Sequence, residues 1–287
     1  MSNYRICKNC IMDTTDPEIE FDKDGLCSHC IQFNQRKDWF PGIEGKQKLD
    51  KIIKSIKNAG RKKEYDCILG LSGGVDSSFL ALKAKEWGLR PLVFHVDAGW
   101  NSELAVANIE KVVKFCNYDL KTYVVDWESM RDLHIAYLKS GIANQDIPQD
   151  HIFFASQYHY SIKSKSKIIL SGGNIATESI FPTSWHNSAM DATNLKDIHR
   201  RFGNKKKLDY KTISFYQYYI WYPLFRSLRT IRPLNYMNYN YNNAVEELST
   251  NTGWTSYGRK HGESVFTKLF QNHILPRRFG FDKRKIQ

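Results

Sequence analysis

An apolar run that ends in the glycine-rich segment LGLSGGVDSS, residues 69–78, constrains the fold of this chain more than any other feature. Residues 65–71 read as a buried strand, and residues 77–88 read as a helix that ends near Gly88. A strand, a glycine-rich turn and a helix in this order predict a phosphate-binding loop, because backbone amides and the positive helix end face one anion. The lysine of the common loop G-x-x-x-x-G-K-[ST] is absent.

Strands and helices alternate around this segment. The hydrophobic pattern predicts a helix at 47–58, strands at 91–97, 120–126 and 167–172, and helices at 101–116, 127–141 and near 150–164. This alternation predicts an α/β fold with a parallel, doubly wound sheet and helices on both faces. Ligands of such sheets bind at the carboxyl ends of the strands, where the segments SGGVDSS, HVDAGW and SGGNIATE fall.

The residue types within the loop suit the phosphates of a nucleotide. Gly73 and Gly74 let the backbone approach an anion closely. Asp76 would repel phosphate, so we interpret it as a ligand of Mg²⁺, which bridges carboxylate and phosphate oxygens; the alternative is a helix cap. Hydroxyl donors come from three serines, Ser72, Ser77 and Ser78.

Four of the six cysteines form two C-x-x-C pairs separated by sixteen residues, which are Cys7, Cys10, Cys27 and Cys30. Four thiolates at this spacing predict a closed, structural zinc site in a zinc-ribbon-like module. Disulfides and an iron–sulfur cluster are the alternatives. His29 lies inside the second pair and is interpreted as a bystander. Residues 18–21 between the pairs predict a short strand.

The motif LSGGVDSS after the first strand of such a sheet resembles the loop of the PP-loop ATP pyrophosphatases. The resemblance implies that the loop holds the β,γ-pyrophosphate of ATP, and that the α–β bond breaks as an adenylate forms. SGGNIATES resembles the second phosphate or metal motif of amide-forming members, which implies that Glu178 shares Mg²⁺ with Asp76. Asp97 would lie near the nucleotide or act as a turn or capping residue. The implied catalytic residues are Asp76, Ser72 and Ser78, and the implied ATP-binding residues are Ser72, Gly73, Gly74, Val75, Asp76, Ser77, Ser78, Asp97, Gly172, Gly173 and Asn174.

The paired C-x-x-C motifs, YDCILGLSGGVDSS, HVDAGWNSELAVANIEKVV and SGGNIATESIFP together resemble the N-acetyl sugar amidotransferases of bacterial surface-polysaccharide and flagellar-glycan synthesis, from about Cys7 to Lys285. The resemblance implies that the acetamido group of a nucleotide-linked sugar, often a diacetamido uronic acid, becomes an acetamidino group. It also implies that ammonia comes from a glutaminase pair similar to that of histidine biosynthesis. Members of that family usually continue with a helical tail beyond GFDKRKIQ.

The remaining cysteines bear on how nitrogen or sulfur is delivered. Cys67 lies in an apolar strand and Cys116 ends an amphipathic helix, so both are interpreted as packing residues. No cysteine follows Cys116, which argues against a persulfide relay. No cysteine suits a glutaminase nucleophile either, since Ser2 follows Met1. We therefore expect ammonia to be free or supplied by a separate subunit.

A formal charge of +12 favours anionic partners without separating nucleotide-sugars from tRNA. A PP-loop tRNA-modifying enzyme (thiolation or amidation) is therefore the main alternative, and a non-catalytic scaffold is a second; we do not expect a nucleic-acid partner. No apolar segment suits a signal peptide or a membrane span, so we expect a cytoplasmic protein without a membrane partner.

Three regions are expected: a zinc module at 1–40, an ATP pyrophosphatase domain at 41–200 and a substrate or partner region at 201–287. Residues 213–225 hold seven aromatics, which fit core packing, a docking surface for the glutaminase or stacking on nucleic acid. Amphipathic helices are predicted within 243–253 and 262–275. Further residues that contact the substrate, pack or cap are expected among Trp185, His186, Asp191, Arg277, Arg278 and Lys283, and His95 and His186 are candidate general bases.

Overall fold

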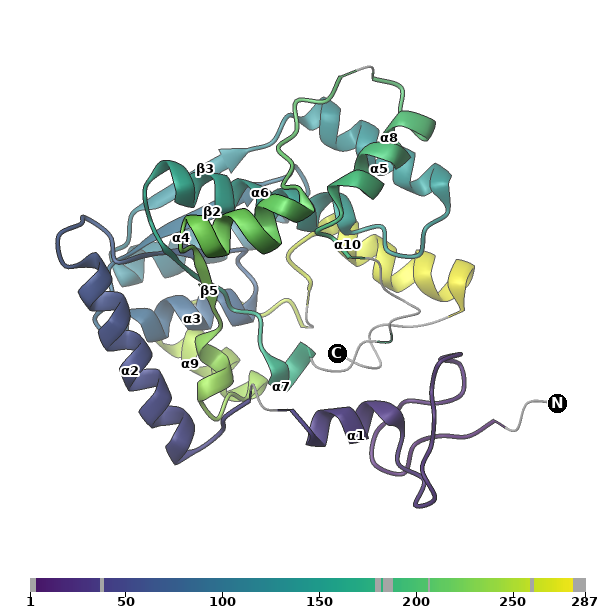
Figure 1. Cartoon of the computed structure of the whole chain (residues 1–287), viewed down its shortest axis with the longest axis horizontal. Helices are drawn as coiled ribbons and strands as arrows, with labels where there is room; N and C mark the ends of the chain where they lie inside the picture. Colours follow the sequence, from purple (N-terminus) through teal and green to yellow (C-terminus); the bar gives the residue numbers. More distant parts are fainter. Residues whose placement is uncertain are drawn as a thin grey trace.

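A computed structural model describes residues 4–36, 39–178, 182, 188–205, 207–258 and 261–280. Its elements alternate as the sequence predicts (Figure 1). In chain order they are α1 (Ser28–Asn34), α2 (Ile43–Gly60), β1 (Cys67–Gly70), α3 (Val75–Glu86), β2 (Pro91–Asp97), α4 (Glu103–Cys116), β3 (Leu120–Val124), α5 (Trp127–Ser140), α6 (Ile147–Lys163), β4 (Ile168–Leu170), α7 (Ile175–Glu178), α8 (Ala192–Phe202), the π-helix η2 (Gln217–Phe225), β5 (Arg229–Ile231), the 3-10 helix η3 (Pro233–Tyr236), α9 (Tyr241–Thr252), α10 (Val265–Leu269) and the π-helix η4 (Phe270–Phe279).

The five strands form one parallel sheet in the order β3-β2-β1-β4-β5. β1 and β2 are buried along almost their whole length, as expected when helices cover both faces of a parallel sheet. β3 was predicted from an apolar pattern, but it is an edge strand with mostly exposed side chains. β5 was not predicted, because its three residues are too short for a periodic pattern.

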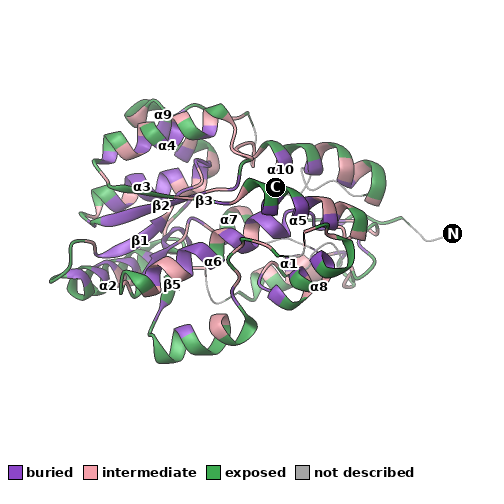
Figure 2. Ribbon diagram, turned by 90° about the horizontal axis from the view of Figure 1, so that it is seen from above, coloured by how far each residue is buried: buried purple, intermediate pink, exposed green. Residues whose placement is uncertain are grey.

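Helices pack on both faces of the sheet (Figure 2). Side chains alternate along a strand, so Leu69 of β1 joins the core beneath α2, α3, α4 and α9. Its neighbour Ile68 packs on the other face with Met130 of α5 and Ile152 of α6. The predicted fold class, a doubly wound α/β fold with an N-terminal cysteine module and a helical C-terminal region, is confirmed.

The helix ends follow local sequence signals. Asp126 caps α5 by accepting a hydrogen bond of 2.8 Å from the amide of Ser129, and Gly141 ends that helix with a φ of 73°. Among the residues that the structure describes, no helix combines the length and the apolar character that a membrane span requires. The predicted domain boundaries near 40 and 200 stay predictions. Two elements of the third predicted region pack with the second, since β5 joins the sheet and α9 joins a helix layer.

The cysteine module contains turns rather than the strand predicted at 18–21. Its extended residues form only isolated antiparallel bridges within the described part, Ile6 with Asp13 and Phe21 with Cys27. The two cysteine-containing turns meet at the sulfur cluster and leave too few residues between them for a ladder of paired strands. α1 begins within the second cysteine pair, directly after Cys27, and includes Cys30.

Candidate active site and metal centre

The glycine-rich loop connects β1 to α3. Gly73 has a φ of +87°, and a Cβ there would lie 2.8 Å from the carbonyl oxygen of Ala105. A side chain is therefore excluded by both conformation and space. Gly74 precedes the first turn of α3, so the amides of the loop and the positive end of a twelve-residue helix point toward one place.

Serine hydroxyls stabilise the turn. The hydroxyl of Ser72 lies 3.1 Å from that of Ser77 and accepts a hydrogen bond of 3.3 Å from the amide of Gly74. The Ser77 hydroxyl accepts from the amide of Ser72 at 3.2 Å and lies 3.2 Å from the carbonyl oxygen of Gly74. Both hydroxyls are held in place within the turn, as a preformed anion site requires.

The second glycine segment lies directly against the first. A Cβ on Gly172 would lie 2.7 Å from the amide nitrogen of Ser77, so backbone meets backbone at this point. The side-chain oxygen of Asn174 accepts a hydrogen bond of 3.0 Å from the backbone amide of Thr177. The backbone amide of Asn174 donates to a carboxylate oxygen of Glu178 at 3.3 Å. The two segments thus form one continuous polar surface, although about a hundred residues separate them in the sequence.

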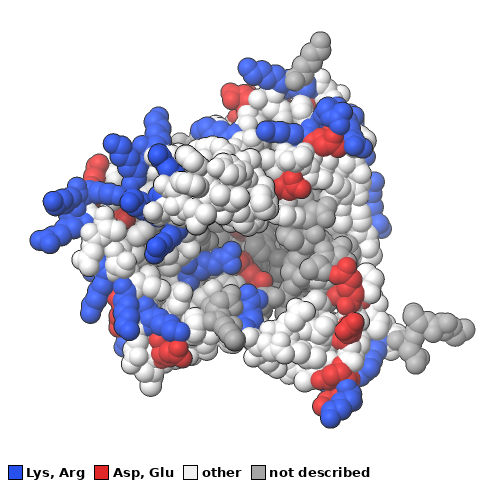
Figure 3. Space-filling view, in the orientation of Figure 1, with Lys and Arg blue, Asp and Glu red and all other residues white. Residues whose placement is uncertain are grey.

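A cavity of about 690 Å³ opens at the carboxyl ends of β1, β2 and β4. The face seen in Figure 3 is hollowed near its centre, with basic and acidic side chains inside the hollow. Of the predicted ATP- and magnesium-binding residues, the lining includes Ser72, Gly74, Val75, Asp76, Ser77, Gly172, Gly173, Asn174 and Glu178.

Three predicted residues lie off this lining, as far as the described residues form it. Gly73 is covered by the C-terminal region. Ser78 is fully buried, and its hydroxyl has no hydrogen-bond partner in the described structure. Asp97 accepts hydrogen bonds from the amide of Gly99 at 2.9 Å and from the Asn101 side chain at 3.1 Å, the contacts of a turn residue. The roles of Ser78 and Asp97 toward ATP stay predictions.

Carboxylates gather at the start of α3. The Tyr239 hydroxyl donates a hydrogen bond to Asp76. Burial, and then the negative charge and hydrogen bond of Asp76, raise the pKa of Tyr239 far above its usual value, and the charge of Glu178 acts in the same direction. The Glu263 carboxylate would lie 2.8 Å from a Cβ on Gly74. Asp76 and Glu178 thus both lie near Tyr239. Carboxylate oxygens are ligands that Mg²⁺ prefers, so this pair has the right ligand chemistry for that ion.

The C-terminal region supports the glycine-rich loop through hydrogen bonds, and this support was not predicted from the sequence. The Trp254 indole nitrogen and the Tyr257 hydroxyl each donate a hydrogen bond of 3.0 Å to the carbonyl oxygen of Gly73. These donors, with Tyr239 and Glu263, come from segments that carry no recognisable local motif. Only the aromatic richness of residues 236–257 could have drawn attention to them.

His95 lies on the cavity wall in a fixed orientation. Its Nδ1 lies 2.8 Å from the carbonyl oxygen of Leu71 and donates to it, while its Nε2 accepts from Asn101 at 3.1 Å. Burial lowers the pKa of His95, which favours the neutral ring. Both ring nitrogens are engaged here, and the role of His95 as a general base stays a prediction.

Several other expected residues lie elsewhere. Asp191 caps α8 through a hydrogen bond of 2.9 Å from the amide of Asn194, which favours the capping interpretation. Arg277 and Arg278 belong to η4 and do not line the cavity formed by the described residues. Trp185, His186 and Lys283 lie outside the described residues.

The aromatic segment 213–225 is partly core and partly surface. Tyr222 is buried against Tyr158, whereas Phe215, Leu224 and Phe225 are well exposed. The segment forms η2, which was not predicted as a π-helix and which contains Pro223. Neither the docking role nor the stacking role is tested by this arrangement.

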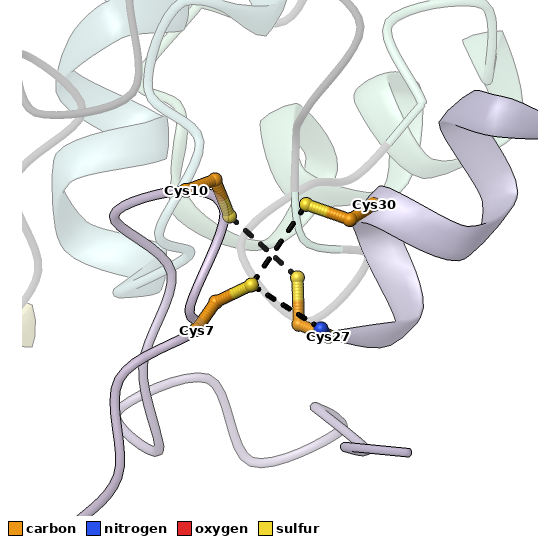
Figure 4. Close-up of side chains that lie close together, drawn as sticks. All are labelled: Cys7, Cys10, Cys27 and Cys30. Carbon is orange, nitrogen blue, oxygen red and sulfur yellow. Dashed lines mark hydrogen bonds between the residues drawn. The ribbon is translucent and has the colours of Figure 1, made fainter. Parts of the chain in front are cut away.

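The four N-terminal cysteines converge on one point (Figure 4). Their sulfur atoms all lie within 4.8 Å of one another, with Cys7 Sγ 3.8 Å from Cys30 Sγ and Cys10 Sγ 3.6 Å from Cys27 Sγ. These separations are too long for disulfides and suit the tetrahedral thiolate shell of zinc. The His29 ring lies 2.8 Å from a carboxylate oxygen of Asp16 instead, as expected of a bystander.

Backbone amides surround this cluster. The amides of Asn9 and Cys27 donate to Cys7 Sγ at 3.4 and 3.3 Å, and the Asn9 side chain donates to Cys30 Sγ at 3.4 Å. Burial alone would raise the pKa of Cys7, but these amide hydrogen bonds lower it to about 6. These amide donors therefore favour the thiolate of Cys7, whereas burial raises the pKa of Cys10 and of Cys27.

Comparison with solved structures finds distant similarities. The chain is similar to an NMN synthetase from Francisella tularensis, with 14% identity and a TM-score of 0.36 over 73% of this chain and 93% of the other. It is similar to an NH3-dependent NAD synthetase from Campylobacter jejuni at 12% identity and a TM-score of 0.36, over 74% and 95% of the two chains. An NAD+ synthetase from Burkholderia pseudomallei matches at 16% identity and a TM-score of 0.33, over 91% and 98%.

No family model matches the sequence. No curated protein matches it either. The residues around the cavity are therefore the basis for a functional assignment.

Proposed function

We propose that this chain is an ATP-dependent amidotransferase of the PP-loop type. It adenylates the acetamido oxygen of a nucleotide-linked sugar and adds ammonia to give an acetamidino sugar, with AMP and pyrophosphate as the other products. The observation that carries the proposal is the contact between the two glycine segments, where Gly172 lies against Ser77 at the N-terminus of α3. Both segments line the same cavity. Backbone amides, two hydroxyls and a helix end there suit the departing pyrophosphate.

Asp76 and Glu178 would hold Mg²⁺ in this proposal. A magnesium ion bound to ATP supplies charge neutralisation on the phosphate oxygens. The hydrogen bond from Tyr239 orients the Asp76 carboxylate, and Gly172 leaves room for Asp76 and Ser77 to lie against the second segment. The local concentration of negative charge on Asp76, Glu178 and Glu263 favours a cation at this place.

The chemistry needs little acid–base help from the protein at its first step. The acetamido oxygen attacks the α-phosphorus, the α–β bond breaks and pyrophosphate leaves. Ammonia then adds to the carbon of the O-adenylated imidate, and loss of AMP leaves the amidine. The cavity contributes by holding the acetamido oxygen in line with the phosphorus and by excluding water.

Ammonia must reach the cavity from elsewhere, because the cysteines outside the zinc cluster are unsuited to glutamine hydrolysis. Cys67 is fully buried in β1, and burial raises the pKa of its thiol well above the usual value. Burial raises the pKa of Cys116 to about 11. A reactive cysteine needs exposure and a lowered pKa. A separate glutaminase pair is therefore the proposed ammonia donor.

A PP-loop tRNA-modifying enzyme is the second candidate. The exposed aromatic side chains of η2 and the exposed Arg226 next to them favour it, since aromatics and bases together stack on single-stranded RNA. The buried state of Cys67 and Cys116 opposes a sulfur relay. Binding of tRNA that falls steeply with salt would support this alternative.

The test is product analysis by mass spectrometry after incubation with ATP, Mg²⁺ and ammonium chloride. One arm contains nucleotide-linked acetamido sugars, and another contains bulk tRNA. We expect AMP and pyrophosphate with a sugar in which NH replaces O, and we expect Asp76→Asn to abolish turnover while the exposed Asp50→Asn on α2 does not. Release of AMP only with tRNA would favour the second candidate, and release of ADP would refute both.

A further inference from the structure

One face of α6 forms a wall of the cavity. Gln149, Phe153 and Gln157 recur at four-residue spacing, so they lie on the same side of the helix, and Asp146 and Asp150 lie beside them. All five line the cavity. The wall therefore carries amides, carboxylates and an aromatic ring, but no basic side chain among these residues.

The start of the C-terminal helical segment completes this wall. Thr267 of α10 and Gln271 of η4 are four residues apart, and both line the cavity. The Ser264 hydroxyl donates to Gln149 at 3.1 Å, and the Thr267 hydroxyl donates to Asp146 at 2.9 Å. These bonds connect the two segments that form the wall.

Two glutamines on the wall have unused hydrogen-bonding groups. Gln157 and Gln271 are only 9% and 7% exposed, and within the part of the chain that the structure describes neither side-chain amide makes a hydrogen bond. Gln157 extends to β1, where a Cβ on Gly70 would lie 2.5 Å from its amide nitrogen. Both side chains line the cavity, so a ligand there can supply the hydrogen bonds that the two amides lack.

The chemistry of the wall differs from that of the loop. The loop offers amide donors and a helix N-terminus, which attract phosphate. The wall presents Asp146 and Asp150, which repel phosphate but accept hydrogen bonds from hydroxyl groups. Each glutamine amide can donate and accept at once, which matches the carbonyl and N–H of an acetamido group.

We propose that the wall formed by α6, α10 and the start of η4 is the acceptor subsite, and that it binds the uncharged, hydroxyl- and acetamido-bearing part of the substrate. Gln157 and Gln271 supply the specificity for the acetamido group, and Phe153 supports the apolar face of the ring. This inference rests on the proposed function for the identity of the acceptor. Contacts link the wall to the loop, since Glu263, next to Ser264, lies against Gly74.

The test measures binding without turnover, so that it stands apart from the amidation reaction. Methyl N-acetylglucosaminide and methyl glucoside are titrated into the full chain, with a non-hydrolysable ATP analogue bound, and followed by saturation-transfer NMR. The unchanged protein should bind the acetamido sugar more tightly. Gln271→Met and Gln157→Met should each weaken its binding about tenfold, the effect of one lost hydrogen bond. Gln47→Met, at an exposed position on α2, serves as the control.

Calorimetry with the ATP analogue separates this subsite from the nucleotide site. The affinity for the analogue should be the same in both variants and in the unchanged protein. Equal binding of the two sugars, variants that bind like the unchanged protein, or a loss of analogue affinity in either variant would overturn the proposal. A preserved acetamido preference without amidine formation would instead count against the proposed reaction and leave the subsite standing.

Discussion

The indole nitrogen of Trp254 donates a hydrogen bond of 3.0 Å to the carbonyl oxygen of Gly73, at a sequence separation of 181. Trp254 is almost fully buried, so this bond ties the C-terminal region to the phosphate-binding loop. Tyr257, which lines the cavity, donates to the same carbonyl, so two aromatic side chains of the C-terminal region support the loop.

Trp254→Phe should lower the free energy of unfolding by about 1–3 kcal/mol, because it removes this buried bond and part of the ring volume. The affinity for ATP should fall as well, since the loop loses a support. Urea unfolding and calorimetry measure the two effects. Tyr257→Phe removes the other donor to the same carbonyl from a less buried position and should have a smaller effect. An unfolding free energy and an ATP affinity both equal to those of the unchanged protein would show that the loop needs no such support.

Gly172→Ala should reduce ATP turnover at least about tenfold, since misplacement of a catalytic segment by a fraction of an ångström is costly. The added Cβ would meet the backbone nitrogen of Ser77 at 2.7 Å, and backbone atoms cannot move aside cheaply. Asp50→Asn, at an exposed position on α2 away from the cavity lining, is the control. Steady-state rates of the two variants check this; equal rates would mean that the two segments are not in tight contact.

The parts of the site that the sequence predicted are those encoded locally. The loop at Gly73 and Gly74 lies between an apolar strand and a helix, and the cysteine pairs have the spacing of a metal site. Parallel sheets bring strand ends together, so the second glycine segment could be placed near the first. These relationships follow from periodicity and spacing alone.

The parts that were missed depend on distant contacts. Tyr239 bonds to Asp76 across 163 residues, and Trp254 bonds to Gly73 across 181. Neither aromatic stands in a motif, and nothing in the sequence distinguishes Tyr239 from its neighbour Tyr241. β5 has three residues, and its pairing with β4 becomes visible only in the sheet. Tertiary packing rather than local pattern determines these features.

Cys27→Ser should remove the zinc ion and increase proteolysis of residues 4–36, because one lost thiolate opens a four-coordinate structural site. The α/β core should keep its unfolding transition. Metal analysis and limited proteolysis measure both effects. Cys116→Ala, in a buried position away from the cluster, should retain the metal. Zinc that stays in the first variant, or leaves in the second, would contradict the assignment.

Asp132 should make folding sensitive to acid. Burial alone would raise its pKa, but hydrogen bonds from the amides of Lys205 and Asn204, and then from His199, lower it to about 2. A lowered pKa stabilises the folded state above the ordinary value near 3.8, and this contribution disappears as the pH falls toward 2.

Asp132→Asn should therefore destabilise the protein strongly at pH 7 and much less near pH 2. Urea unfolding at several pH values measures the difference. Asp197→Asn, at an exposed pair with Arg200 and Arg201, should show little effect at either pH. A destabilisation by Asp132→Asn that does not change with pH would rule out this carboxylate as the source.

The fate of the acetamido oxygen tests the proposed reaction most directly. The sugar nucleotide that supports AMP formation is prepared with oxygen-18 in its acetamido carbonyl and incubated with ATP, Mg²⁺ and ammonium chloride. If the oxygen attacks the α-phosphorus, the heavy isotope must appear in the phosphate of AMP, and the acetamidino sugar must contain none. Label that stays in the sugar, or that appears in pyrophosphate or free phosphate, would contradict adenylation of the amide.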